Sequence, residues 1–140
     1  MLKGIDKLLT GDLLKALCDM GHGDELVIAD ANFTAETVAK RLIRVSGVDG
    51  VRVAEAVLSV FPLDTYVDTP ACVMDLTDGD KDKGMSEPVI WDAYARVTGK
   101  ELGLIERFAF YARTKNAYLV IQTGEERQYG NLLLTKGVVL

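Results

Sequence analysis

The chain has 140 residues, of which 49% are hydrophobic, and its formal net charge at pH 7 is −5. This length and composition predict a single domain over residues 1–140 whose core needs no disulfide bonds. The negative charge and the scatter of the basic residues argue against nucleic acid or an anionic membrane as the main partner. No apolar run approaches the roughly 18 residues that a membrane span needs, and the N-terminus lacks a signal-peptide pattern, so we expect a cytoplasmic protein.

The first third of the chain predicts one helix and two strands. Apolar residues at helical spacing indicate a helix that is capped by Thr10 or Asp12 and stopped by Gly21. Residues 26–29 form a short continuous apolar run, which is typical of a buried strand. A second strand is expected over residues 42–45.

Helices and strands continue to alternate through the rest of the chain, and this alternation favours an α/β fold. In the helix expected over residues 51–61, Val60 is among the inward-facing residues and Pro62 ends the helix. The charged residues 78–84 predict a solvated turn. The other expected elements are helices over residues 87–97 and 106–114 and strands over residues 71–76, 118–121 and 132–134.

The only histidine, His22, lies in a Gly-His-Gly-Asp-Glu loop just before the first expected strand. An imidazole can both give and take a proton near neutral pH, and the flanking glycines let backbone approach a ligand closely. Asp30 follows the C-terminal end of the same strand, where ligand-contacting side chains tend to emerge in open α/β sheets. The two residues are therefore candidates for proton transfer, with Asp30 either orienting the histidine or binding a ligand hydroxyl group.

A polar loop over residues 124–131 separates the last two expected strands. Within it, Tyr129, Gly130 and Asn131 supply a phenol, an open backbone and an amide. Such groups orient a polyhydroxylated ligand in a binding site. The alternative interpretation is a plain connecting loop with a surface tyrosine.

The two cysteines, Cys18 and Cys72, lie far apart in apolar stretches, so we expect small core residues rather than a disulfide. With a single histidine they form no zinc-binding set. No glycine-rich phosphate loop follows a strand, and no serine lies in a nucleophile elbow. Proton transfer by ordinary side chains is the chemistry that the remaining candidates favour.

Four sequence blocks that contain these residues resemble the L-fucose mutarotase and D-ribose pyranase family. The resemblance runs from about residue 2 to the C-terminus, and the blocks keep the family's order and spacing. It implies a three-layer α/β/α fold and the interconversion of sugar anomers or ring forms with no metal and no organic cofactor. It also implies a ring-shaped homo-oligomer, commonly a decamer. The blocks are Met20–Glu25, Asp30–Phe33, Arg107–Tyr111 and Tyr129–Asn131, the last followed by Lys136 and Gly137.

The resemblance also implies roles for single residues. His22 matches the family's proton donor, and Asp30 matches its substrate-contacting acid. Tyr129 either binds the sugar or relays a proton. Sugar contacts are implied at Arg107, Tyr129, Gly130 and Asn131.

Two positions separate the branches of this family. Proteins of the ribose type have a second histidine where this chain has Arg107, and an alanine where it has Gly130. The chain follows the fucose type at both positions, so we expect an isomerase that interconverts the anomers of a monosaccharide, in the first place L-fucose. The alternatives are a D-ribose pyranase-like enzyme and a catalytically silent sugar-binding protein on the same scaffold. Residues 78–103 resemble neither branch well.

Overall fold

A mixed sheet of six strands forms the centre of the computed structural model, which describes residues 1–140. The strands are β1 (Glu25–Ala29), β2 (Leu42–Val45), β3 (Ala71–Met74), β4 (Gly103–Ile105), β5 (Leu119–Thr123) and β6 (Leu132–Thr135). Their order across the sheet is β2-β5-β1-β6-β3-β4, and β6 runs antiparallel to its neighbours β1 and β3. The remaining neighbours are parallel, so five strands end at one edge of the sheet.

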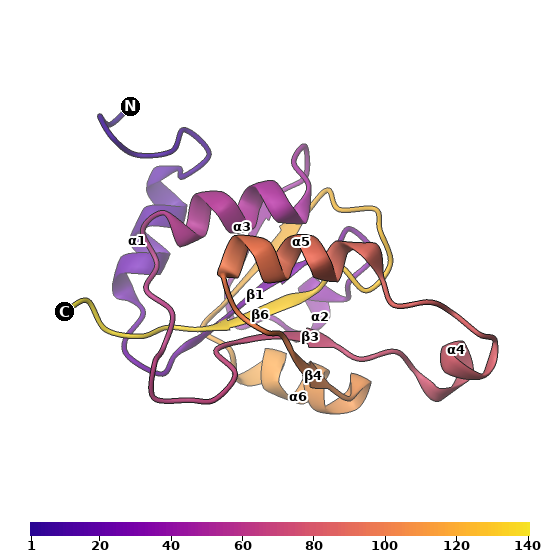
Figure 1. Ribbon diagram of the computed structural model, residues 1–140. Helices are drawn as coiled ribbons and strands as arrows, with labels where there is room; N and C mark the ends of the chain where they lie inside the picture. The colour runs from indigo at the N-terminus through magenta and orange to yellow at the C-terminus, as the bar shows by residue number, and fades with distance from the viewer.

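Helices cover both faces of this sheet (Figure 1). They are α1 (Gly11–Asp19), α2 (Ala35–Val38), α3 (Gly50–Leu58), α4 (Asp78–Asp82), α5 (Val89–Thr98) and α6 (Arg107–Asn116). Helices α1, α3 and α5 pack on one face, where 20 buried residues form the larger core. Helices α2 and α6 pack on the other face over a core of 10 buried residues. These three layers confirm the expected α/β/α fold, and the short α4 projects beyond the end of β3.

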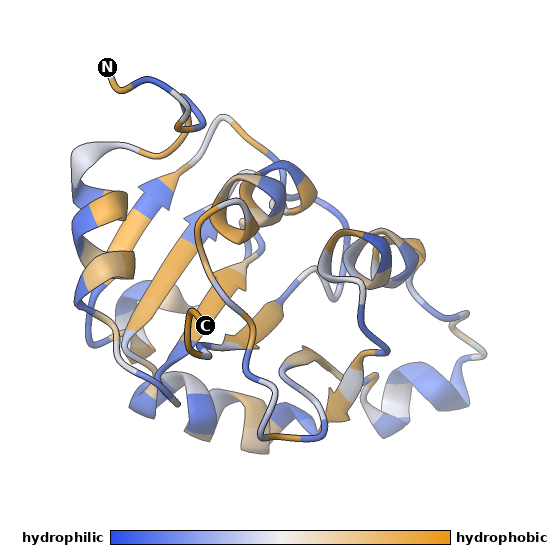
Figure 2. Ribbon diagram, turned by 60° about the vertical axis from the view of Figure 1, so that its left-hand side comes forward, coloured by the Kyte–Doolittle hydropathy of each residue, from blue (hydrophilic) through white to orange (hydrophobic).

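Strand β1 lies in the middle of the sheet and contributes to both cores. Successive side chains of a strand point to opposite faces, so Leu26 and Ile28 join the core under α1, α3 and α5. Val27 and Ala29 join the core under α2 and α6. All four are fully buried, which explains why this run of sequence is continuously apolar. Figure 2 shows the same pattern as apolar strands between helices that carry hydrophilic segments. None of these helices reaches the length and apolar character that a bilayer-spanning segment requires.

Helix α1 begins as predicted and ends slightly early. The Thr10 side chain caps it by accepting a hydrogen bond from the Leu13 amide. The helix ends at Asp19 with the next residue extended, so Gly21 lies outside the cap. Cys18 is exposed on this helix rather than buried, which corrects the expectation for that thiol.

Helix α3 ends at Leu58, earlier than the expected residue 61. Val60 therefore lies outside the helix and is 39% exposed, whereas Phe61 is buried in the core. Pro62 disfavours a helical conformation of Phe61, and the helix already ends before that residue, at the C-cap residue Ser59.

Three elements of three to five residues were not predicted, namely α2, α4 and β4. Residues 78–84 were expected as a solvated turn, but most of them form α4. The side chain of Thr77 starts this helix by accepting a hydrogen bond from the Asp80 amide. The acidic residues of the first turn further favour a helix there, because they interact well with its N-terminal dipole.

Candidate active site

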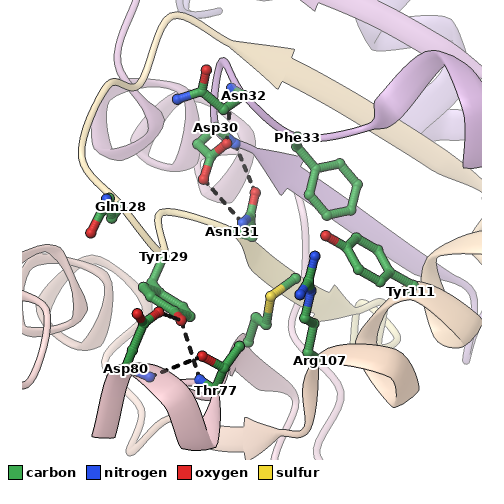
Figure 3. Close-up of a pocket in the computed structure, with 11 residues that line it drawn as sticks. Asp30, Asn32, Phe33, Thr77, Asp80, Arg107, Tyr111, Gln128, Tyr129 and Asn131 are labelled. Atoms are coloured by element: carbon green, nitrogen blue, oxygen red, sulfur yellow. Dashed lines mark hydrogen bonds between the residues drawn. The ribbon is translucent and has the colours of Figure 1, made fainter. Parts of the chain in front are cut away.

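A cavity of about 360 Å³ opens at the edge of the sheet where β1 and β3 end and β6 begins (Figure 3). This is the edge at which ligand sites are expected in open α/β sheets. Four segments build its wall: the loop after β1, the segment from β3 to α4, the start of α6, and the loop before β6. Four predicted site residues line it, namely Asp30, Arg107, Tyr129 and Asn131. The other lining residues are Asn32, Phe33, Met74, Thr77, Asp80, Tyr111 and Gln128.

Asp30 and Asn131 form a buried pair on one wall of the cavity (Figure 3). The Asp30 amide donates to Asn131 Oδ1 at 2.9 Å, and Asn131 Nδ2 donates to Asp30 Oδ2 at 3.1 Å. Because the backbone amide can only donate, the orientation of the Asn131 side chain is fixed. Burial raises the pKa of Asp30 despite these hydrogen bonds and that from the Asn32 amide. The Asp30 carboxyl is thus held rigidly and keeps its proton to a higher pH than an ordinary aspartate.

Tyr129 lies on the facing wall in a strained backbone conformation. Its φ of 59° makes it the one non-glycine residue with a positive φ, a state that costs about 1 kcal/mol or more. Its carbonyl accepts a hydrogen bond from Trp91 Nε1 at 3.1 Å. Its hydroxyl donates to Asp80 Oδ2 and accepts from the Thr77 amide. Contacts at both ends of the residue therefore hold the phenol at the cavity.

Gly130 does not line the cavity but shapes the loop that does. A Cβ atom at this position would lie 2.8 Å from the Glu125 Cγ and 3.1 Å from the Arg127 oxygen. The Gly130 carbonyl accepts a hydrogen bond from the buried Tyr94 hydroxyl at 2.8 Å. The structure therefore gives this glycine a packing role, in which it lets its two neighbours reach the cavity.

Arg107 is the first residue of α6, and its side chain extends over the ring of Tyr111, one turn later. The nearby Tyr111 hydroxyl raises the pKa of the Arg107 guanidinium, which is a permanent cation at neutral pH. Sequence reasoning did not select Tyr111 as a site residue. Its spacing of four residues from Arg107 on a helix was the signal that could have found it.

His22 is not in this cavity. It lies in the turn before β1, whereas Asp30 follows the other end of that strand. A five-residue strand spans roughly 17 Å, so within one chain Asp30 cannot orient the histidine. The alternative, in which Asp30 binds a ligand hydroxyl group, stays a prediction. His22 is half-exposed, and its ring contacts that of Tyr66 at a centroid distance of 5.3 Å.

The carboxylate beside the histidine belongs to Asp64. The Asp64 Oδ1 atom lies 3.0 Å from His22 Nε2, and the carboxylate is almost completely buried. Burial acts to raise the pKa of Asp64, but hydrogen bonds from the Tyr66 amide and from His22 outweigh it and lower that pKa. Sequence reasoning missed Asp64 because 42 residues separate it from the histidine and no local pattern joins them.

Residues 3–139 match the model of the RbsD / FucU transport protein family. The chain belongs to this family. It is 48% identical over 146 aligned residues to the fucose mutarotase of Mus musculus, an alignment that covers 99% of this chain and 95% of that protein. The crystal structure of FucU from Bifidobacterium longum superimposes with a TM-score of 0.91 at 49% identity, over 99% of this chain and 100% of that one. The fucose mutarotase of Streptococcus pneumoniae, solved in complex with L-fucose, also gives a TM-score of 0.91, at 40% identity and the same coverage.

In this member of the RbsD / FucU family, the cavity offers groups of three kinds. Asp30 and Asp80 are carboxyl groups in different environments, and Arg107 is a cation that can donate several hydrogen bonds. Phe33 and Met74 add apolar surface to the wall. A small ligand with several hydroxyl groups and one apolar face would find partners for both.

Proposed function

We propose that this protein is a fucose mutarotase, an isomerase that interconverts the α and β anomers of L-fucose. The observation that carries the proposal is the meeting of Asp30, Arg107 and Asn131 in one cavity, from three segments far apart in the sequence. These are residues that the family resemblance marks as sugar contacts. The similarity to fucose mutarotases over nearly the whole chain supports the same activity.

The chemistry of the sugar suits this cavity. L-Fucose carries ring hydroxyl groups and one methyl group, and the cavity wall carries both polar side chains and the apolar Phe33 and Met74. The volume of about 360 Å³ lies near the lower end for small-molecule sites, which is about 300–1,000 Å³. A single sugar ring therefore suits the space better than an oligosaccharide.

Mutarotation opens the hemiacetal ring and closes it on the other face of the anomeric carbon. Opening requires a proton at the ring oxygen O5 and removal of the proton from the anomeric hydroxyl O1. A positioned acid or base contributes about 10²–10⁴-fold to such a step. We assign the donation to O5 to His22, with Asp30, Arg107 and Asn131 holding the sugar hydroxyl groups.

The position of His22 implies that it acts in the cavity of a neighbouring copy. Within one chain the histidine and the cavity lie at opposite ends of β1. Large apolar side chains are exposed at both ends, with Tyr66 at 75% beside the histidine and Phe108 at 71% next to Arg107. Contact between unlike ends of successive copies closes into a ring when the rotation permits. We therefore propose a ring-shaped homo-oligomer, for which the family resemblance suggests a decamer.

We also place the protein in the cytoplasm. Both cysteines are free thiols, and Cys18 is exposed. Free exposed thiols persist in a reducing compartment and are uncommon in secreted proteins.

Polarimetry tests the activity. The optical rotation of freshly dissolved α-L-fucose should relax faster in proportion to the protein concentration. His22→Ala should slow the catalysed part at least about tenfold, and Arg107→Ala should mainly weaken the apparent affinity for sugar. Catalysis with D-ribose but not with L-fucose would favour the D-ribose pyranase-like enzyme. Sugar binding without catalysis would favour a catalytically silent sugar-binding protein.

Mixing two variants tests the shared site. His22→Ala and Asn131→Ala each inactivate every site in a pure oligomer. In a co-assembled 1:1 mixture, about a quarter of the sites combine an intact histidine with an intact cavity from the next copy. We expect about a quarter of the wild-type activity to return. A mixture as inactive as its parents, with mixed assembly verified by native mass spectrometry, would contradict a shared site.

A further inference from the structure

One acidic side chain of the cavity has no role in the assignment above. Asp80 comes from α4, within the segment that resembles neither branch of the family, and it lines the cavity together with Thr77. In Figure 3, Asp80 and Tyr129 meet on the side of the cavity away from Asp30 and Asn131. The Tyr129 hydroxyl donates its hydrogen bond to Asp80 Oδ2.

The hydrogen bonds of the Tyr129 hydroxyl limit how it can meet a substrate. A phenol has one proton to donate and two lone pairs that can accept. The proton is directed to Asp80, and the Thr77 amide occupies one lone pair at 3.2 Å. One accepting position is left for a ligand. Tyr129 therefore meets a sugar hydroxyl group as an acceptor, with its own proton already directed to a carboxylate.

We propose that Asp80, acting through the Tyr129 hydroxyl, is the proton acceptor of this site. The inference rests on the proposed mutarotase function. During ring opening the O1 proton passes to Tyr129 Oη while the phenol's own proton passes to Asp80 Oδ2. The C1–O1 bond becomes a double bond, the C1–O5 bond breaks, and O5 takes a proton from the proton donor assigned above. Ring closure on the other face reverses each transfer, so both protein groups regain their starting states.

The charges around Asp80 suit this role. The hydrogen bond from Tyr129 lowers the pKa of Asp80 and outweighs burial, with smaller help from Thr77, Lys83 and Arg107. The carboxylate is thus ionised before the reaction and free to accept a proton. Asp30 on the other wall shows the opposite shift, because burial raises its pKa.

Asp80→Asn tests the proposal directly. The amide keeps the size of the side chain and an oxygen that accepts from Tyr129, but it cannot take up a proton. We expect the exchange rate constant at saturating L-fucose to fall about 100-fold or more, while the dissociation constant changes by less than about threefold. The fluorescence of Trp91, the only tryptophan, provides the readout for sugar binding, because its indole N–H donates a hydrogen bond to the carbonyl of the cavity residue Tyr129. Asp78→Asn is the matched control: it removes the same charge from the exposed side of the same helix and should retain full activity.

Two further variants separate proton transfer from a structural role. In Asp80→Ala, added formate should restore exchange in a concentration-dependent way, because it can occupy the space of the missing carboxylate. Tyr129→Phe removes the phenol hydroxyl group, which is the other protein group of the proposed proton path. The double variant Asp80→Asn/Tyr129→Phe should be no slower than the slower single variant, since the two residues act as a unit.

The outcomes are distinct. If the wild type catalyses the exchange and Asp80→Asn keeps more than half of its rate, the role of Asp80 is overturned. The mutarotase function is then unaffected. A loss explained wholly by weaker sugar binding, or multiplicative losses without rescue by formate, would overturn the role of Asp80 as well. Absence of exchange in the wild type would overturn both proposals.

Discussion

At the scale of single residues, the cavity places carboxyl groups of unlike character on two walls. Asp30 is buried, fixed by Asn131, and keeps its proton to a raised pH. Asp80 is partly exposed, accepts a hydrogen bond from the Tyr129 hydroxyl and stays ionised to a lower pH than usual. The difference arises from burial and from the donors around each group, not from the residue type.

Asp30 should make stability depend on pH in a direction that follows from its environment. Burial raises its pKa, so the folded protein binds this proton more tightly than the unfolded chain does. As pH rises from about 4, near the ordinary pKa of aspartate, the unfolded state is progressively favoured until the raised pKa is passed. We expect the free energy of unfolding of the wild type, relative to Asp30→Asn, to decrease over that range.

Urea unfolding of both proteins at one fixed protein concentration measures this difference. The exposed Asp78→Asn variant is the control, and its difference from the wild type should hardly change with pH. A difference for Asp30→Asn that is constant, or that grows with pH in favour of the wild type, would show that burial does not govern this carboxyl.

At the scale of elements, the site depends on the packing of α5 against α3. Tyr94 of α5 lies against Gly50 at the start of α3, and its hydroxyl holds the Gly130 carbonyl of the cavity loop. A Cβ atom on Gly50 would overlap that hydroxyl. We expect Gly50→Ala to reduce the free energy of unfolding by about 1–3 kcal/mol and to weaken sugar binding through the displaced loop.

Chemical denaturation and L-fucose titration followed by Trp91 fluorescence measure the two effects. Gly47→Ala is the matched control, because a Cβ atom there meets nothing within 4 Å and its φ is not positive. That variant should stay within about 0.5 kcal/mol of the wild type. Equal stability of the two variants would show that Tyr94 adjusts without cost.

Elements that carry a clear apolar pattern could be predicted from the sequence, whereas the short α2, α4 and β4 could not. The amphipathic α1 and α3 and the buried β1 carry clear patterns, whereas β4 has only three residues. Residues 78–84 look like a solvated turn because α4 buries none of its residues. The motif residues Asp30, Arg107 and Asn131, which the family resemblance selected, lie in one cavity because the segments that carry them meet at one edge of the sheet.

Long-range pairings were beyond reach of the sequence for a physical reason. Asp30 was considered as a partner that orients His22, but the two residues lie at opposite ends of a strand, which holds them far apart. The actual neighbour, Asp64, arrives from a loop whose backbone is tied to β6 by the hydrogen bond from its amide to Thr135. Asp80 and Tyr129, which form a hydrogen bond, are likewise far apart in the sequence, at a separation of 49 residues. No local periodicity encodes such contacts.

At the scale of the whole molecule, the exposed apolar ends should determine assembly. Val139 in the C-terminal tail is 85% exposed, and the tail leaves the fold beside Pro62, at the end of the molecule that carries His22. In the proposed ring, a charged side chain at position 139 would be buried between neighbouring copies without an ion-pair partner, which is unfavourable. We therefore expect Val139→Glu to lower the mass of the oligomer and to reduce activity together with it.

Mass photometry and the polarimetric assay follow these two quantities across protein concentration. Thr37→Glu adds the same charge to an exposed position on α2 and should leave both unchanged. A monomeric Val139→Glu protein with full activity would contradict the shared site.

Exchange NMR on the anomeric protons of L-fucose at equilibrium tests most directly whether this cavity catalyses mutarotation. We expect magnetisation transfer between the α and β signals that grows with protein concentration and disappears in Asp30→Ala, because the cavity then lacks the carboxyl held by Asn131. Transfer at the rate of buffer alone, in the presence of folded wild-type protein, would contradict the claim that this cavity catalyses mutarotation.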